Sequence, residues 1–426
     1  MTDAPSAPRR VGAVSVVIPA LNAATTIAET LASLQAQRFT EWEAVVVDDG
    51  STDDTSAIVA AIAASDPRIS IVRQESAGAA AARNRGLTLI RHRWVLFLDA
   101  DDWILPEHLE RLAAVLDSSP AADAAVCGWT LVRAGRAIES EYCRGEGDLF
   151  PILARRPAFA IHTCLIDRAR VDAVGGFDVR RIVHQDWQLW QRIARTGARF
   201  AVIRDPLAVY RIHEGTITGD QSRLAAEALG VIALGHAPDP NVPNPHPHYA
   251  NGRPSHELTD AQVTHLAWPA GIEIARGSDA RSLFEGVADG TAPGAAEHVG
   301  TIIARAAATH TDPATLTSPA SWLYLDRLLG TLLDRLAGLT GDQTLPRTAR
   351  LAFERHMLEI TGEARALSLI ATGHVEVGAT IGDLPATGNV ERLRIAVTME
   401  GDSLGTIELP VIEGRVRAAV VSDAVA

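Results

Sequence analysis

The sequence is poor in cysteine, in aromatic residues and in long apolar runs. Its 426 residues include three cysteines, and aromatic residues make up 5%. The three thiols, Cys127, Cys143 and Cys164, fit neither an even disulfide framework nor zinc-ligand spacing, so we expect them reduced. No run reaches about eighteen apolar residues, and the first ten residues do not resemble a signal peptide. We therefore expect a cytoplasmic protein without a transmembrane segment, and leave peripheral membrane attachment open.

Positive charge is also in short supply. Lysine and arginine number 39 against 52 acidic residues, which gives a formal net charge of −13. Sequence-independent binding to nucleic acid or to an anionic membrane needs the opposite balance. A small anionic ligand held by a metal ion and a few arginines remains compatible with this charge. The 47% hydrophobic content is ordinary for a globular protein, and the length predicts two or three domains.

Short β-branched runs alternate with helical patterns in the first hundred residues. One predicted helix begins at a capping box formed by Thr26 and Glu29 and has Ile27, Leu31 and Leu34 on its apolar face. Such alternation is typical of an α/β fold with a doubly wound, mostly parallel sheet. The predicted strands are 13–19, 42–50, 68–72 and 93–99, and the helices after the first are 55–65 and 77–90.

The later part of the chain changes character. A helix is expected over 185–197, closed by Gly197, and 235–254 is rich in proline, histidine and asparagine. The apolar stripe of one later helix is Trp322, Leu325, Leu329, Leu332 and Leu336. We expect a loose arm at 1–12, a catalytic domain at 13–220, a linker with long loops and some helix at 221–300, a helical region at 301–370 and a small β-rich module at 371–426.

Two acidic clusters follow predicted strands. Asp48 and Asp49 come after the second strand, and Asp99, Asp101 and Asp102 after the fourth. In doubly wound sheets, ligands bind beyond the carboxyl ends of the strands, so the clusters are candidates for one site. Taken alone, an Asp-x-Asp turn is more often a solvated turn than a site. Its carboxylates also suit Mg²⁺ or Mn²⁺, which complete their shells with phosphate oxygens and water.

A helix rich in small residues offers positive charge to this site. Its segment "AGAAAARNRG" carries Arg83 and Arg85, and arginine is a natural partner of phosphate and carboxylate. An exposed helix face would explain the same residues. Neither G-x-G-x-x-G after the first strand nor G-x-x-x-x-G-K-[ST] is present, which excludes the dinucleotide fingerprint and the P-loop.

Six segments together resemble the family 2 glycosyltransferases with the GT-A fold. They are, in order, "SVVIPALNAATTIAETLASLQAQ", "VVVDDGSTDDT", "AGAAAARNRG", "FLDADD", "VGGFDVRRIVHQDWQLWQRIARTG" and "YRIHEGTIT". Each is modest alone, but their shared order makes the match specific. The resemblance covers roughly residues 13–218 and leaves residues 220–426 without a counterpart.

On the donor side, the resemblance implies a nucleotide site. Asp49 resembles the aspartate that reads the base, and Pro19, Leu21 and Asn22 are expected near the base and ribose. Family members often carry an aromatic residue where Leu21 stands, which predicts weaker base stacking. Arg83 is similar to the arginine of the family's A-R-N-x-G helix near the nucleotide.

The resemblance also implies a metal site. Asp99 and Asp101 match the D-x-D pair, in which Asp101 would bind the metal ion on the diphosphate and Asp99 would contact ribose or metal-bound water. Asp102 is expected to support the loop. His213 resembles the histidine that approaches the metal or the diphosphate, although a histidine packed under a loop would look the same.

The catalytic base implied by the resemblance is Asp186. The usual Glu-Asp pair is Gln185-Asp186 here, which removes one negative charge. A helix N-cap is the alternative interpretation of Asp186, since a helix is predicted to begin there. Trp187 and Trp190 on the same helix are interpreted as core residues and not as a sugar platform.

These roles together predict a metal-dependent inverting glycosyltransferase. It would move a sugar from a nucleotide diphosphate donor, with a UDP-sugar as first choice and Mn²⁺ or Mg²⁺ as cofactor, to a hydroxyl group of a glycan or other acceptor, in polysaccharide biosynthesis. The alternatives are a sugar-nucleotide nucleotidyltransferase and a non-catalytic sugar-nucleotide-binding protein. The C-terminal half is a candidate for acceptor recognition or for a homo-oligomer contact.

Overall fold

The computed structural model divides the chain into two compact units. The first comprises residues 1–219 and 230–253, and the second 220–229 and 254–426. The structure describes residues 11–133, 135–212, 221–292, 295–310, 319–361, 370–385, 392–400, 402–412 and 414–425. Most of the predicted N-terminal arm therefore lies outside the described residues, as does His213.

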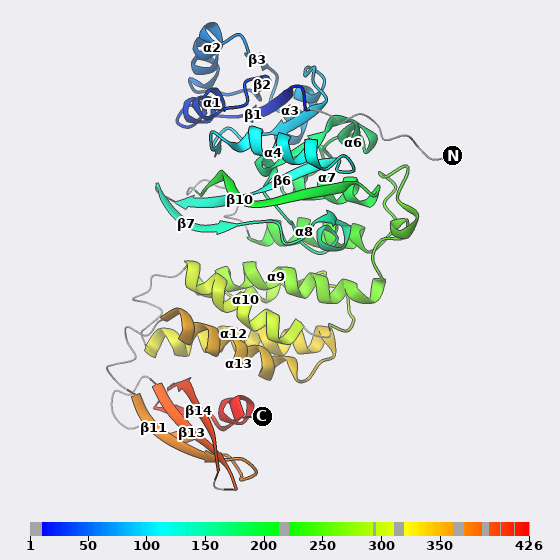
Figure 1. Cartoon of the computed structure of the whole chain (residues 1–426). Coiled ribbons are helices and arrows are strands. Elements are labelled where there is room, and N and C mark those ends of the chain that lie inside the picture. The colour runs from blue at the N-terminus through cyan, green and yellow to red at the C-terminus, as the bar shows by residue number, and fades with distance from the viewer. Residues whose placement is uncertain are drawn as a thin grey trace. The chain divides into compact units, whose positions relative to one another are not determined.

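Four parallel strands at one side of a ten-stranded sheet set the position of the site (Figure 1). Ala20 lies beside Asp48 and Val17 beside Phe97, so neighbouring strands end at the same edge. All of β1 and β2 is buried, as expected for strands covered on both faces. In spatial order these strands are β3 (Ile69–Arg73), β2 (Trp42–Asp48), β1 (Val14–Ala20) and β4 (Trp94–Phe97).

Beyond β4 the sheet becomes mixed. β9 (Cys164–Asp167) is antiparallel to both β4 and β6 (Ala124–Arg133). The long strand β10 (Arg199–Ile212) is parallel to β6 and antiparallel to β5 (Trp103–Ile104), which follows the D-x-D turn. Two further strands pair off this order, β7 (Arg136–Glu141) on β6 and β8 (Gly147–Asp148) on β10. The predicted α/β fold class is confirmed, with the parallel order strongest in the first hundred residues.

The helices predicted between the first four strands are present. Ile27, Leu31 and Leu34 are buried as expected, but the predicted capping box does not form. Thr26 is the N-cap of α1, and its hydroxyl donates to the Ala23 carbonyl at 3.3 Å instead of to the helix. The α-helices in the first two hundred residues are α1 (Ile27–Gln35), α2 (Thr55–Ser65), α3 (Ala79–Leu87), α4 (His108–Ser118), α5 (Phe150–Leu153), α6 (Arg168–Ala173) and α7 (Gln185–Arg195).

Helix α3 packs closely on β1 because Gly86 faces the strand. A Cβ atom at Gly86 would lie 2.3 Å from Cγ1 of Val17. Asn84, on the same helix, exchanges two hydrogen bonds of 2.8 Å with the backbone of Phe177. These contacts fix the helix that carries Arg83 against the strand end.

Helix α7 packs against the last residues of the first unit. It ends before Gly197, whose φ of +85° confirms the predicted C-terminal glycine, and Trp187 and Trp190 are buried core residues. Arg195 is fully buried and donates to the carbonyls of Leu234, Ala237 and Tyr249. The proline-rich segment 235–254 is thus anchored to the first unit.

More of residues 221–300 is helical than the sequence predicted. Proline, histidine and asparagine dominate the middle of this stretch and concealed the helical patterns on either side. The helices are α8 (Gln221–Gly235), α9 (Leu258–Ala275) and the short 3₁₀ helices η3 (Pro247–Tyr249), η4 (Ser255–Glu257) and η5 (Ala280–Phe284).

The second unit contains the predicted helical region. Leu329, Leu332 and Leu336 of the predicted stripe are buried in its core, while the side chains of Trp322 and Leu325 lie outside the described part of the chain. Its larger helices after α9 are α10 (Ala295–His310), α12 (Pro319–Thr340) and α13 (Leu345–Thr361).

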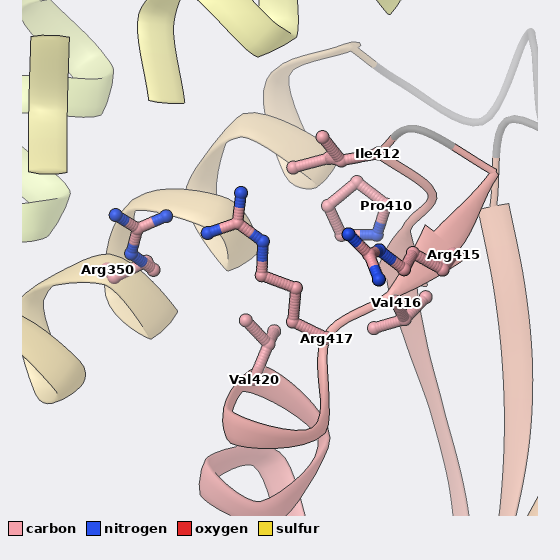
Figure 2. Close-up of a pocket in the computed structure, with 7 residues that line it drawn as sticks. All are labelled: Arg350, Pro410, Ile412, Arg415, Val416, Arg417 and Val420. Carbon is pink, nitrogen blue, oxygen red and sulfur yellow. The ribbon is translucent and has the colours of Figure 1, made fainter. Parts of the chain in front are cut away.

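A small β-rich module ends the chain, as predicted, and its last residues form the unpredicted helix α14 (Ala418–Val425). Asp383 ties this module together, since it accepts from the backbone of Ala418 at 2.9 Å and pairs with Arg415 at 3.0 Å. A small depression is lined by Arg350 of α13 and by six residues of this module, among them Arg417 (Figure 2). The strands are β11 (Ile370–Glu376), β12 (Leu384–Pro385), β13 (Arg392–Met399), β14 (Asp402–Pro410) and β15 (Arg415–Val416).

All three cysteines are free and buried, and all lie in the first unit. Burial raises the pKa of each thiol. The three cysteines are unbridged, as predicted. Among the residues that the structure describes, no helix combines the length and the apolar character needed to cross a membrane.

Candidate active site

The residues expected near a base and ribose lie at the end of β1. Leu21 is 51% exposed, so its side chain is accessible where the strand ends. Asn22 adopts a positive φ of 51°, and Pro19 is buried within the strand, beside Val47. The structure therefore offers Leu21 for an apolar contact with a ligand and gives Pro19 a place inside the sheet.

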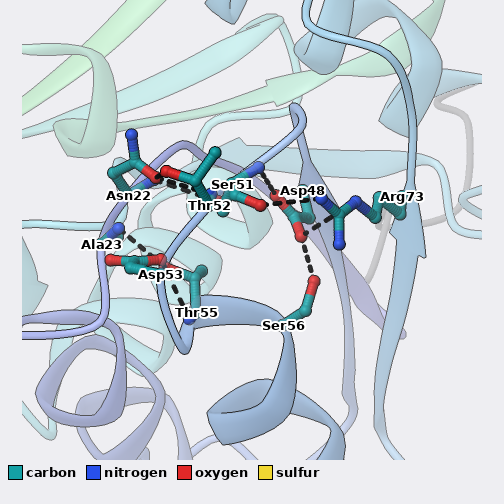
Figure 3. A network of polar contacts seen from close by, with 9 residues as sticks. All are labelled: Asn22, Ala23, Asp48, Ser51, Thr52, Asp53, Thr55, Ser56 and Arg73. Carbon is teal, nitrogen blue, oxygen red and sulfur yellow. Dashed lines mark hydrogen bonds and ion pairs between the residues drawn. The ribbon is translucent and has the colours of Figure 1, made fainter.

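A polar network joins the loops after β1 and β2 (Figure 3). Asn22 accepts from the Thr52 backbone at 2.9 Å, and its own N–H donates to the Ser51 hydroxyl at 3.0 Å. The fully buried Asp48 carboxylate accepts from the Ser51 backbone at 2.8 Å and from the Ser56 hydroxyl. Burial alone would raise the pKa of Asp48, but these hydrogen bonds lower it overall. Asp48 thus acts as the internal anchor of this corner.

The Asp49 carboxylate holds the loop before α3. One oxygen accepts from the Gln74 side chain at 2.7 Å and from the Ala77 backbone at 2.9 Å. The other accepts from the Ser76 hydroxyl at 3.2 Å and from the Gly78 backbone at 2.8 Å. Both oxygens are engaged, so a nucleotide base read by Asp49 would replace at least one of these partners.

Arg83 connects the D-x-D turn with the start of α7. One terminal nitrogen of its guanidinium donates to Oδ1 of Asp99 at 2.5 Å, and the other to Oε1 of Gln185 at 2.9 Å. The Arg83 side chain is only 8% exposed, whereas Asp99 is 28% exposed. The predicted arginine, the first D-x-D aspartate and the Gln-Asp pair therefore meet at one place.

Two elements hold the D-x-D turn from outside. The Thr30 hydroxyl of α1 lies 3.0 Å from the Ala100 carbonyl and 2.8 Å from that of Asp102. From β10, Arg211 donates through Nε to the Asp101 carbonyl at 2.8 Å, and its backbone N–H donates to the Asp102 carboxylate at 2.8 Å. Neither Thr30 nor Arg211 was predicted to support this turn, although both lie in segments that carry the family resemblance.

Asp102 supports the turn from inside, as expected, through a partner that the sequence did not indicate. Its carboxylate lies 3.1 Å from Nδ1 of His162, and both side chains are buried. Burial raises the pKa of Asp102; for His162, burial alone would lower the pKa, but the Asp102 charge raises it overall. His162 comes some sixty residues later in the chain, and nothing near it in the sequence marks it as a partner.

The phenol of Tyr210 shows that the acidic residues share one neighbourhood. Its ring stacks on that of His162, with the centroids 6.2 Å apart. Burial raises the pKa of Tyr210, and the negative charges of four carboxylates raise it further. These carboxylates belong to Asp102, Asp99, Asp101 and Asp186. The Arg83 bonds to Asp99 and to Gln185, the neighbour of Asp186, place the predicted base close to the D-x-D turn.

Asp186 lies in the first turn of α7 and is not its N-cap. The N-cap is His184, in the left-handed conformation with φ 53°, and it forms no side-chain cap bond. The N-cap interpretation of Asp186 is therefore wrong, because the helix begins one residue before it. Negative charge in the first turn of a helix is favoured by the helix dipole.

The aspartates of the D-x-D turn suit a divalent cation of the Mg²⁺ or Mn²⁺ type. Asp99 and Asp101 lie on one bend with partly exposed side chains. Such ions are held by one or two carboxylates and complete their shells with phosphate oxygens and water, so this donor set fits. Within the described ranges, no three histidine, cysteine or acidic side chains are arranged to hold a metal ion.

The chain belongs to glycosyl transferase family 2, and it is a glycosyltransferase. The family model matches residues 15–143. The amylovoran biosynthesis glycosyltransferase AmsB of Erwinia amylovora is 30% identical over 228 residues, 49% of this chain and 72% of AmsB. The predicted family and the predicted enzyme class are confirmed by these matches.

One further relative matches a shorter stretch, and one solved structure matches most of the chain at lower identity. The succinoglycan biosynthesis protein ExoO of Rhizobium meliloti is 40% identical over 118 residues, which cover 28% of this chain and 33% of ExoO. The chain thus spans about a third of the length of that relative. The structure of S. aureus TarS 1–349 in complex with UDP covers 84% of this chain and 92% of TarS 1–349, at 18% identity and a TM-score of 0.45.

Proposed function

We propose that this glycosyltransferase transfers a sugar from a nucleotide diphosphate sugar to a hydroxyl acceptor by a single, inverting displacement that requires a divalent cation. The observation that carries the proposal is the Arg83 bridge, which joins the donor-side Asp99 to the start of the helix that carries Asp186. A UDP-sugar is the first donor to test. The names of the relatives support polysaccharide biosynthesis as the context, and a glycan is the first acceptor to test.

On the donor side, the residues would bind and orient the nucleotide. The exposed Leu21 would pack against the base, and Asp49 would accept from it once a loop partner moves away. Asp101, supported by Asp99 and by His213 of the quoted motif, would hold the metal ion. When bound, that ion supplies positive charge against the diphosphate, which stabilises the leaving group.

On the acceptor side, Asp186 would accept the proton of the attacking hydroxyl. The oxygen then bonds to the anomeric carbon as the bond to the diphosphate oxygen breaks, so the configuration inverts. Arg83 would hold Asp99 and the start of α7 in a fixed relation while this occurs. The family pattern supports these roles, as do the bonds by which Arg83 joins Asp99 to the residue before Asp186.

Calorimetric titration tests the donor class. UDP, GDP and dTDP are each titrated with and without Mn²⁺ into the wild type and into Asp101→Ala. We expect one nucleotide to bind with a metal requirement, and Asp101→Ala to weaken that binding at least about tenfold. Asp334→Ala, an exposed aspartate of α12, is the matched control and should bind as the wild type does. Equal binding with and without metal would contradict the proposed metal site.

The base is tested by Asp186→Asn. We expect nucleotide binding to persist, while sugar transfer falls by about 10²- to 10⁴-fold, the range for losing a general base. The anomeric configuration of the product, measured by NMR, should be opposite to that of the donor. Retained configuration, or full turnover by Asp186→Asn, would overturn the mechanism. Binding without any turnover by the wild type would instead favour a non-catalytic sugar-nucleotide-binding protein.

A further inference from the structure

We propose that Gln185 is a positioning residue that requires an amide, and that a glutamate at this position would impair the enzyme. The inference rests on the proposed function, because it concerns the placement of the base Asp186. The family pattern has a Glu-Asp pair here, so the simplest expectation is that glutamine at position 185 makes the enzyme less active than glutamate would. The hydrogen bonds around Gln185 indicate instead that this chain needs the amide.

The Gln185 side chain is used at both ends. It is 8% exposed, and its oxygen accepts from Arg83 at 2.9 Å. Its nitrogen donates to the backbone carbonyls of Arg181 and Ile182, each at 3.0 Å. A primary amide supplies both an acceptor and two donors, so this orientation satisfies every partner.

An ionised glutamate could keep only one of these functions. It has no donor, so one carboxylate oxygen would face two carbonyl oxygens at about the distance of the present hydrogen bonds. A buried acceptor without a donor costs free energy, more so when it is charged. The other carboxylate oxygen would still accept from Arg83, so the loss falls on the two donated bonds.

The bonds of Gln185 tie the first residue of α7 to the segment before the helix. They hold the segment before the helix, in which His184 has a positive φ of 53° that residues other than glycine rarely adopt. Asp186 is the next residue along the helix. Loss of the two donated bonds would release this turn and shift Asp186 relative to Arg83 and Asp99, and a shift of about 1 Å at a reacting group can cost about 100-fold in rate.

The test compares Gln185→Glu, which keeps the acceptor, with Gln185→Met, which keeps the volume and loses both kinds of bond. For each variant we measure kcat and KM for sugar transfer and the dissociation constant of the nucleotide that the wild type binds among UDP, GDP and dTDP. Gln188→Met is the matched control, since Gln188 is a buried glutamine one turn along α7 with no bond to Arg83. Thermal unfolding checks that each variant is folded.

We expect kcat to fall at least tenfold in both Gln185 variants, with the nucleotide dissociation constant within about threefold of wild type. A kcat of Gln185→Glu equal to or above wild type would overturn the inference, as would an unchanged kcat in Gln185→Met. Loss of nucleotide affinity in step with kcat would also overturn it, because Gln185 would then act on the donor. Failure of the wild type to transfer any sugar would overturn the proposed function first, and this inference with it.

Discussion

At the scale of single residues, adjacent carboxylates of this chain have different structural roles. Asp48 faces into the protein and accepts from Ser51 and Ser56, whereas Asp49 faces the loop before α3. Asp99 is paired with Arg83 and partly exposed, and Asp102 is buried against His162. Asp48 and Asp49 are both buried and differ in the loop that each one holds, whereas in the second cluster Asp102 is buried and Asp99 lies nearer the surface. Acidic composition alone could not separate these roles, because they depend on which face each side chain meets.

A charged residue far from the site serves as a structural anchor. Glu43 is 6% exposed and accepts from the Ser15 hydroxyl, the Arg91 backbone and the Arg91 guanidinium, each at 2.7 Å. Burial alone would raise the pKa of Glu43, but the hydrogen bonds from Arg91 and Ser15 lower it overall. Ionised Glu43 therefore stabilises the folded chain at the amino ends of β1 and β2.

We predict that Glu43→Gln lowers the free energy of unfolding by about 1–3 kcal/mol at neutral pH. Because the folded-state pKa is lowered, the wild-type contribution is complete above the ordinary glutamate pKa of about 4.3 and is lost as the pH falls through the lowered value. The gap between variant and wild type should therefore shrink on acidification. Urea titrations at neutral and acidic pH measure it, with the exposed Glu110→Gln as control. A gap that does not change with pH would contradict the assignment.

At the scale of elements, α3 shows how a small residue, Gly86, fixes the position of the proposed site residue Arg83. Gly86 lets the helix approach Val17 of β1, and Arg83 lies one turn earlier on the same helix. A Cβ at 2.3 Å from Val17 Cγ1 would force the helix or the strand to move. Any such movement would reach the bonds from Arg83 to Asp99 and Gln185.

We predict that Gly86→Ala lowers the free energy of unfolding by about 1–3 kcal/mol, the usual cost of overpacking a core. Transfer activity should fall with it, because Arg83 is displaced. Gly338→Ala in α12 is the matched control: its Cβ would meet nothing within 4 Å, so it should raise stability by about 0.5–1 kcal/mol. Chemical denaturation of both variants measures the two changes in the free energy of unfolding. Stabilisation by both alanines would show that α3 can move away without cost.

Local patterns predicted the first four strands and the helices between them, because each is set by periodicity within its own segment. The start of α2 at Thr55 and the end of α7 before Gly197 follow from nearby residues. The antiparallel part of the sheet was not predictable in this way, because β9 is placed by pairing such as that of Cys164 with Val126. His162 was missed for the same reason: its partner Asp102 is distant in the chain.

At the scale of the whole molecule, the proposed site residues belong to the first compact unit, whereas residues 254–426 belong to the second. The second unit has its own core, which includes Leu329, Leu332 and Leu336, and a separate cluster packs within its small β-rich module. Each part therefore buries its own apolar surface. The family model, which ends at residue 143, does not reach the second unit, and the role of that unit in acceptor recognition stays a prediction.

The placement of the three cysteines allows the opening of the first unit to be followed by the rate of thiol modification. Cys127, Cys143 and Cys164 are all buried in the first unit, and the second unit contains none. A thiol reagent added to the native protein should therefore react only at the rate at which the first unit opens. Bound nucleotide should slow this reaction in proportion to its occupancy, since a ligand that binds only the folded state stabilises it. The rate of thiol modification, followed by mass spectrometry, would thus report donor binding without any label on the donor.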